Sequence, residues 1–173
     1  MRTSIGICTV VAAAAIAGLG GCTWSVPYKL DPTTRSGEPE SGLKVDFAGT
    51  TVGGDGMSWL DGRAVVRNVS PRVIAWDPNA LTVVGEGCNL RTRSPRVKCK
   101  GADQATAVSG RIEFMPGESC VLYFGLEGYG LGACGRVRRR GHSVPERLFV
   151  DLGEATVGGE VVRVGRFELR PVE

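Results

Sequence analysis

The 173-residue sequence has one histidine, few aromatic residues and no Cys-x-x-Cys pair. A single histidine without a partner motif gives no basis for a histidine-based nucleophile or metal cluster. The missing Cys-x-x-Cys spacing argues against a zinc site made of four thiolates. No nucleophile elbow or phosphate-binding loop is present either. The sequence therefore predicts a protein that is not an enzyme, with no catalytic residue, metal or cofactor.

The sequence also lacks a hydrophobic run long enough to span a bilayer. Its apolar N-terminal stretch, residues 5–19, is shorter than the roughly 20 residues that a membrane-spanning helix needs. The stretch follows a basic start and ends at Leu19-Gly20-Gly21-Cys22, which is typical of a cleaved export signal. The ending resembles the bacterial lipobox. This resemblance implies that residues 1–21 are removed and that Cys22 carries lipid, including palmitate-type acyl chains.

Such a lipoprotein would be held stably on a cell membrane or outer membrane, because several acyl chains anchor a protein where a single chain is marginal. The domain would lie on the extracytoplasmic side. Residues 22–42 are rich in proline, serine, threonine and charge, which predicts a flexible tether with a reach of about 25 Å. An alternative is that Trp24, Val26 and Tyr28 pack as a first strand or lie in the membrane interface.

No segment carries a helical stripe of apolar residues, and 26 glycines and short valine-rich runs favour strands and tight turns. The turn signals include Asp77-Pro78-Asn79 and Pro116-Gly117, the latter suited to the centre of a type II turn. Together these features predict one all-β domain, residues 43–173, folded as an antiparallel, immunoglobulin-like sandwich of seven to nine strands. The strands are expected at residues 44–47, 63–69, 72–76, 81–84, 111–115, 120–126, 148–152 and 161–169.

The last of these runs contains a break in its alternation. Val162 and Val164 share one face of a strand, but Phe167 and Leu169 are out of phase with them. One extra residue would restore the phase, so we expect a β-bulge at Gly165-Arg166.

Four cysteines remain in the mature domain besides the lipid-bearing one, and export would place them in an oxidising compartment. Three pairings are open to Cys88, Cys99, Cys120 and Cys134. The pairing favoured by the sequence joins Cys88 to Cys99 around a Ser94-Pro95 turn, and Cys120 to Cys134 across a glycine-rich excursion.

Charge is nearly balanced over the mature chain, which by itself gives no reason to expect a nucleic-acid partner, and we expect none. It is uneven along the chain, since residues 88–142 hold ten basic and four acidic residues. We expect a basic surface there for an anionic partner such as lipid headgroups, an envelope polymer or an acidic protein face. Its candidate residues are Arg91, Arg93, Arg96, Lys98, Arg136, Arg138, Arg139 and Arg140.

Residues 63–124 resemble the immunoglobulin-like extracytoplasmic domains of bacterial lipoproteins. The motifs concerned are Asn68-Val69-Ser70 at the end of a strand and Pro116-Gly117-Glu118-Ser119 before the strand of Leu122 and Phe124. The resemblance implies a sandwich with an adhesion, assembly or binding role. The expected function is thus a membrane-anchored binding or structural module of the cell envelope. The alternatives are an accessory subunit of a secretion or pilus machine, and an envelope hydrolase with an unrecognised site.

Overall fold

The computed structural model describes residues 24–31, 41–54, 58–90, 94–126, 136–139 and 141–173. These residues form β-strands almost throughout, and their helical structure is limited to one short 3-10 helix, η1 (Pro78–Ala80). The predicted all-β, antiparallel sandwich is confirmed. No helix in the described part of the chain is long and apolar enough to cross a membrane.

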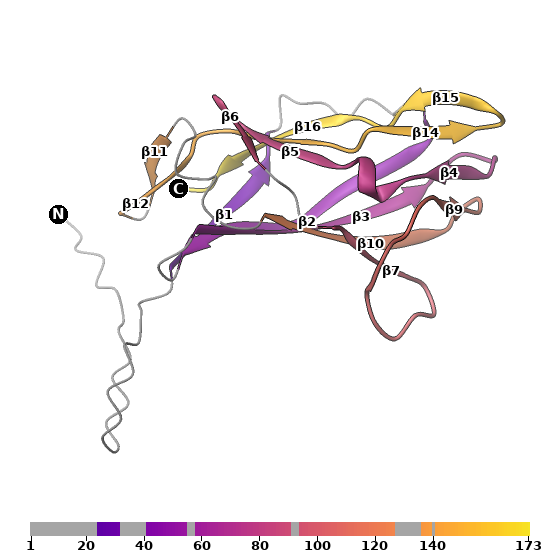
Figure 1. Cartoon of the computed structure of the whole chain (residues 1–173), viewed down its shortest axis with the longest axis horizontal. Coiled ribbons are helices and arrows are strands. Elements are labelled where there is room, and N and C mark those ends of the chain that lie inside the picture. Colours follow the sequence, from indigo (N-terminus) through magenta and orange to yellow (C-terminus); the bar gives the residue numbers. More distant parts are fainter. Residues whose placement is uncertain (1–23, 32–40, 55–57, 91–93, 127–135, 140) are drawn as a thin grey trace, which may run out of the picture.

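Ten strands form one antiparallel sheet in the order β6-β5-β13-β16-β1-β2-β3-β10-β7-β8 (Figure 1). In chain order they are β1 (Trp24–Leu30), β2 (Leu43–Gly54), β3 (Ser58–Asn68), β5 (Thr82–Gly85), β6 (Cys88–Leu90), β7 (Arg96–Cys99), β8 (Thr106–Ala107), β10 (Ser119–Leu126), β13 (Leu148–Asp151) and β16 (Arg166–Pro171).

Two smaller sheets complete the fold. One has the order β15-β14-β4-β9, made of β4 (Ile74–Trp76), β9 (Ile112–Phe114), β14 (Glu154–Val157) and β15 (Glu160–Arg163). The other pairs β11 (Arg136–Arg139) with β12 (His142–Pro145). The described strands outnumber the expected seven to nine, because strands of two to four residues such as β8 and β6 carry too little alternation to be recognised.

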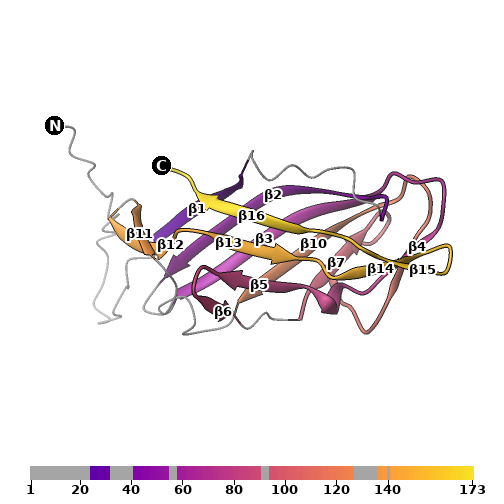
Figure 2. The ribbon, with the colours of Figure 1, turned by 90° about the horizontal axis from the view of Figure 1, so that it is seen from above.

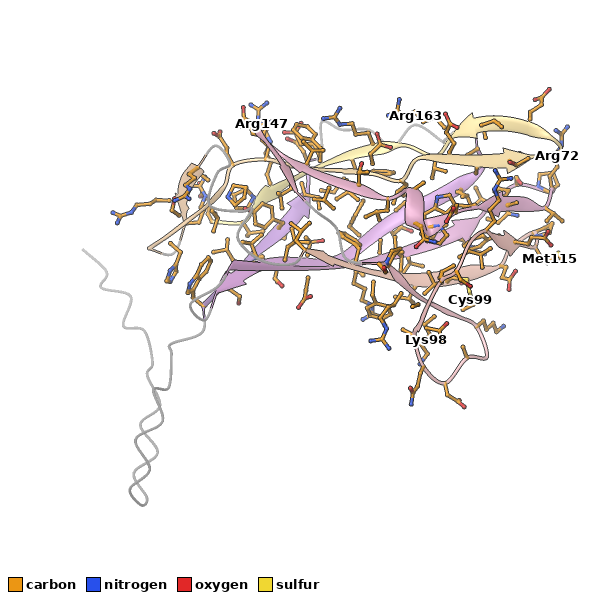
Figure 3. All side chains as sticks on the ribbon, viewed as in Figure 1. Arg72, Lys98, Cys99, Met115, Arg147 and Arg163 are labelled. Atoms are coloured by element: carbon orange, nitrogen blue, oxygen red, sulfur yellow. A yellow bond between two sulfur atoms is a disulfide. The ribbon has the colours of Figure 1, made fainter. Side chains whose placement is uncertain are left out.

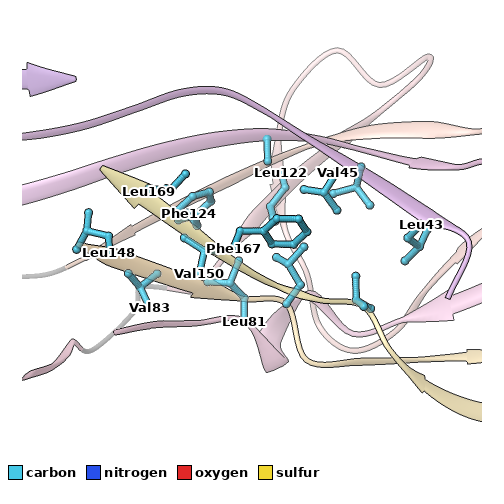
Figure 4. Packing of buried hydrophobic residues seen from close by; sticks show 14 of the residues in the cluster. Leu43, Val45, Leu81, Val83, Leu122, Phe124, Leu148, Val150, Phe167 and Leu169 are labelled. Atoms are coloured by element: carbon cyan, nitrogen blue, oxygen red, sulfur yellow. The ribbon is translucent and has the colours of Figure 1, made fainter. Parts of the chain in front are cut away.

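The large sheet curls until its two halves face each other as the layers of a sandwich. Figure 1 shows β5, β13 and β16 above β2, β3 and β10, and Figure 2 shows the same strands from above. The core lies between the layers, where Leu122 and Phe124 of one half face Val150 and Phe167 of the other (Figure 4). Burying these apolar side chains is the main force that holds the two layers together.

The interpretation of residues 22–42 as a tether is wrong for residues 24–30. They form β1, the strand that joins the two halves between β16 and β2. Val26 is fully buried and Tyr28 is only 4% exposed, so the alternation of these side chains is that of a core strand. The alternative drawn from the sequence, that Trp24, Val26 and Tyr28 pack as a first strand, is therefore confirmed. Residues 22, 23 and 32–40 lie outside the described part of the chain.

The predicted β-bulge at Gly165-Arg166 is also wrong. Leu148 pairs with Leu169 in β13 and β16, and Val157 pairs with Glu160 in β14 and β15, so the hairpin keeps one register throughout. The alternation of buried side chains changes phase because both arms of the hairpin leave the ten-stranded sheet and enter the four-stranded sheet at the same point. This point lies next to Gly153, between β13 and β14 on one arm and between β15 and β16 on the other. A bulge occurs instead in β2, where the register with β3 shifts between Phe47 and Gly49.

A buried tyrosine makes the stability of the sandwich depend on pH. The Tyr28 hydroxyl donates a 2.5 Å hydrogen bond to the carbonyl oxygen of Pro145, and burial raises the pKa of this hydroxyl well above its usual value. The folded state therefore holds the phenol proton more tightly than the unfolded chain. The stabilisation is complete below the unfolded pKa of about 10 and is lost progressively as the pH rises above it.

We expect the free energy of unfolding to fall above about pH 10 with an additional slope of up to about 1.4 kcal/mol per pH unit from Tyr28. Tyr28→Phe removes this part of the slope and, through loss of the hydrogen bond, about 1 kcal/mol of stability at neutral pH. Urea denaturation at a series of alkaline pH values measures both effects. Parallel pH profiles for the two proteins would contradict the assignment.

Candidate functional site

The basic residues predicted to form one surface lie in two separate places. Arg96 and Lys98 are on β7, near one edge of the ten-stranded sheet, whereas Arg136, Arg138 and Arg139 are on β11 of the separate two-stranded sheet. Figures 1 and 2 both show β11 at the far end of the molecule from β7. The expectation of a single surface is therefore wrong for the described residues. Arg91, Arg93 and Arg140 lie outside them.

A basic surface does form around β7, but its other members come from earlier strands. Outward-facing side chains of β2, β3, β10 and β7 lie next to one another in register. Arg63 pairs with Tyr123, which pairs with Arg96 on its other side, while Lys44 pairs with Arg67. Adjacent strands lie about 5 Å apart, so these side chains are neighbours. We call this surface the basic sheet face: Lys44, Arg63, Arg67, Arg96 and Lys98.

Most of the charge on the basic sheet face is uncompensated. Within the described residues, Lys44 alone of the five has a carboxylate partner, Asp46, at 3.7 Å. Arg96 donates to the carbonyl oxygen of Ala105 at 2.6 Å and Lys98 to that of Asp103 at 2.9 Å, and both acceptors are neutral backbone groups. Figure 3 shows Lys98 below the lower layer, pointing away from the core. The face is therefore suited to an anionic partner.

A hollow of about 700 Å³ opens beside these cations. Its lining includes Arg63, Arg96 and Tyr123 and one carboxylate, Asp61, and Gly49 contributes no side chain to fill it. A Cβ atom at Gly62 would come within 2.1 Å of the Phe124 ring beneath it, so glycine is required there. The Arg63 guanidinium lies 5.9 Å from the centre of the Tyr123 ring, which leaves an aromatic surface between two arginines.

The sequence analysis missed Lys44, Arg63, Arg67 and Tyr123 as members of this face. A usable signal existed, because each alternates with buried residues such as Ala64 and Leu122. Alternation indicates which side of a strand faces solvent. It does not indicate which strands are neighbours, so the charges of β2 and β3 could not be added to those of β7.

The second basic group lies at the end of the molecule that carries the start of β1. We call it the β11–β12 end: β11, β12 and Trp24. The side chain of His142, on β12, stacks on Trp24 with ring centres 4.3 Å apart and planes only 5° from parallel. The described residues thus place the histidine in an aromatic stack.

The β11–β12 end is fastened to the sandwich. Val144 is 1% exposed, and the next residue, Pro145, accepts the hydrogen bond from Tyr28. Arg136 and Arg138 remain exposed on β11, and Arg139 lies 4.0 Å from the carboxylate of Glu173. The charges at this end are therefore presented from a fixed position.

The favoured cysteine pairing is wrong, because Cys99 is joined to Cys120 in a disulfide. The two residues are directly opposite each other on β7 and β10. Cys88 begins β6, which pairs with β5, so the proposed hairpin between Cys88 and Cys99 does not exist. Cys22, Cys134 and the side chain of Cys88 lie outside the described residues.

A second hollow, of about 530 Å³, brings together three acidic residues, Asp77, Asp151 and Glu154, near Arg111 and Arg163. Two of these carboxylates have structural roles: Asp77 accepts from the backbone of Asn79 to cap η1, and Asp151 binds Arg163 and the amide of Gly153. No group of three or more histidine, cysteine or acidic side chains in the described ranges could hold a metal ion.

In comparisons with known proteins, the chain matches no family model, no curated protein and no solved structure.

Proposed function

We propose that this chain is a lipid-anchored, non-enzymatic binding module of the bacterial cell envelope, which holds an anionic polysaccharide on its basic sheet face. The observation that carries the proposal is a row of cations, Arg63, Arg67, Arg96 and Lys98, beside an open hollow. None of the four has a carboxylate partner within the part of the chain that the structure describes. The lipid anchor is supported by the lipobox-like ending Leu19-Gly20-Gly21-Cys22.

The polysaccharide is favoured by the form of the surface. The cations lie on neighbouring strands rather than at one point, which suits a partner that carries repeated negative charges. Tyr123 lies between two of the arginines and offers the apolar face of its ring to a sugar ring. The hollow is open, as a binding site for a segment of a long polymer needs to be.

Reversing two charges of the basic sheet face should weaken polymer binding. In Arg63→Glu/Arg67→Glu, two attractions of about 0.5 kcal/mol each become repulsions, and we expect an affinity loss of about thirtyfold at low salt. Polygalacturonate is a suitable probe, and its methyl ester is the uncharged comparison. Binding is measured by biolayer interferometry over a series of salt concentrations, since exposed charges are screened by salt.

A matched control is available at the other end of the molecule. Arg136→Glu/Arg138→Glu makes the same change in charge on β11, and it should leave polymer binding close to that of the parent chain. Equal losses in the two variants would show that net charge alone attracts the polymer. Equal binding of the acidic polymer and its ester would also contradict the proposal.

A further inference from the structure

We infer that the β11–β12 end rests on anionic phospholipid headgroups and that the opposite end of the sandwich, formed by β14 and β15, points away from the membrane. The inference rests on the lipid anchor of the proposed function. It adds an orientation and a second contact surface, which the polymer-binding face does not require.

The first argument is the length of chain between the anchor and the fold. Cys22 precedes Trp24, the first residue of β1, by two residues. Two residues span at most about 7 Å. A lipid on Cys22 therefore holds the start of β1 within about 7 Å of the anchoring residue. A linker this short keeps the β1 end of the domain next to the membrane.

The second argument is that the start of β1 is rigidly connected to the basic hairpin. Trp24 pairs with Gly54, and its ring lies so close that a Cβ atom at Gly54 would be 2.9 Å from the indole nitrogen. The ring also stacks on His142, at the start of β12. When the anchor holds Trp24 close to the membrane, the β11–β12 hairpin is therefore also close to it.

The third argument is charge. β11 presents two exposed arginines, and Arg139 is the third cation of the same strand. Among the described residues, the acidic groups near this strand include Glu146, directly after β12, and Glu173, which lies near Arg139. A basic segment close to an anionic membrane surface gains about fivefold in bound population per arginine, so this excess favours headgroups as the occupant.

The long shape of the molecule then determines what lies far from the membrane. Figures 1 and 2 place β11, β12 and the start of β1 at one end and the β14–β15 hairpin at the other. The basic sheet face lies on the side of the sandwich, where an anchored domain leaves it open to a polymer.

Fluorescence quenching on the lipidated full-length chain tests the orientation. An environment-sensitive fluorophore is attached through Ser143→Cys on β12 or through Glu160→Cys on β15, both exposed positions, after oxidation of the native cysteines. The proteins are reconstituted in vesicles of phosphatidylcholine and phosphatidylglycerol that contain a headgroup-labelled quencher. We expect strong quenching of the fluorophore at position 143 and only weak quenching of the fluorophore at position 160.

The charge dependence provides the control. Arg136→Glu/Arg138→Glu should lower the ratio of docked to undocked chains by at least 25-fold, because each substitution removes an attraction of about fivefold and adds a repulsion. Vesicles of phosphatidylcholine alone should also lower this ratio. Arg63→Glu/Arg67→Glu should leave the quenching unchanged. Equal quenching at both labelled positions would overturn the orientation. A fluorescence change at position 143 that depends on protein concentration and not on lipid charge would also overturn it, because this result indicates contact with a second copy of the chain.

The mass of the N-terminal peptide distinguishes a failure of the inferred orientation from a failure of the lipid anchor. A lipid-modified Cys22 with equal quenching at the two positions overturns the orientation alone and leaves polymer binding untouched. An unmodified Cys22 overturns the anchor of the proposed function and the orientation together.

Discussion

Replacing Asn68 with alanine should lower the free energy of unfolding by about 3 kcal/mol, since several buried polar groups would lose their partners at once. Asn68 is fully buried at the end of β3. Its amide nitrogen donates to the carbonyl oxygens of Arg72 at 2.7 Å and Phe114 at 3.0 Å. Its amide oxygen accepts from the backbone amide and the hydroxyl of Ser70, both at 2.9 Å.

The backbone of Asn68 is equally committed. Its amide donates to Glu118 and its carbonyl accepts from Gly117, so one residue connects the turn after β3 to the turn before β10. For a chain of this size, the loss corresponds to a decrease in melting temperature of about 6 to 12 °C. Thermal and urea denaturation, followed by circular dichroism, measure it.

Two further variants separate hydrogen bonding from packing. Asn68→Asp keeps the shape but replaces the donating nitrogen with an oxygen that faces two carbonyl groups, so we expect a loss at least as large as that of the alanine variant. Ser70→Ala removes a single hydroxyl and should cost about 1 kcal/mol. If Asn68→Ala lowered the free energy of unfolding by less than Ser70→Ala does, the role assigned to Asn68 would be contradicted.

The Asn68 network explains why two short motifs of the sequence were informative. The two motifs, Asn68-Val69-Ser70 and Pro116-Gly117-Glu118-Ser119, are far apart in the chain. In the fold, Asn68 is hydrogen-bonded both to Ser70 of its own motif and to the backbone of the second motif. The turn predicted at Pro116-Gly117 is present, with a hydrogen bond from the amide of Glu118 to Met115 and a positive φ at Gly117. Sequence reasoning identified each turn correctly and had no means of joining them.

Strand prediction succeeded where the alternation was long and failed where it was short or hidden. Every predicted run coincides with a strand, from β2 to the last run, which covers β15 and β16. β1 was predicted only as an alternative to a tether, because proline, serine and charge surround it, and β11 was obscured by the four basic residues among positions 136–140. The candidate site depended on strand order, which brings β3 and β10 beside β7 and leaves β11 elsewhere. A single sequence contains no direct record of that order.

The cysteine pairing failed for the same reason. Cys88 and Cys99 are nearly symmetric about Ser94-Pro95, and a local hairpin was the simplest interpretation of that spacing. In the fold, β6 and β7 belong to opposite halves of the curled sheet in the order of its strands. The partner of Cys99 comes from β10, 21 residues later. Of the three pairings open to four cysteines, the observed bond is compatible only with the one that also joins Cys88 to Cys134.

Removing the Cys99–Cys120 disulfide should produce the second large effect. The bond closes a loop with a sequence separation of 21 residues. In the chain-entropy model, a loop of this length stabilises the folded state by about 3 kcal/mol. We expect Cys99→Ala/Cys120→Ala to lose about that amount in urea denaturation. Adding dithiothreitol should destabilise the parent chain more than the double variant, because the variant has already lost this bond.

The same substitution should also weaken the candidate site, because the disulfide joins β7, which carries two cations of the basic sheet face, to β10. Lys98 precedes Cys99, and Arg96 pairs with Tyr123 on the same two strands. β7 has only the two-residue strand β8 on its other side, so without the bond it is expected to separate from the sheet more often. Polygalacturonate affinity should therefore fall in the double variant while vesicle docking of the lipidated chain, which depends on the distant β11–β12 end, stays unchanged. Peptide mapping without reduction must first recover Cys99 joined to Cys120; recovery of Cys88 joined to Cys99 would contradict both the pairing and this link between stability and binding.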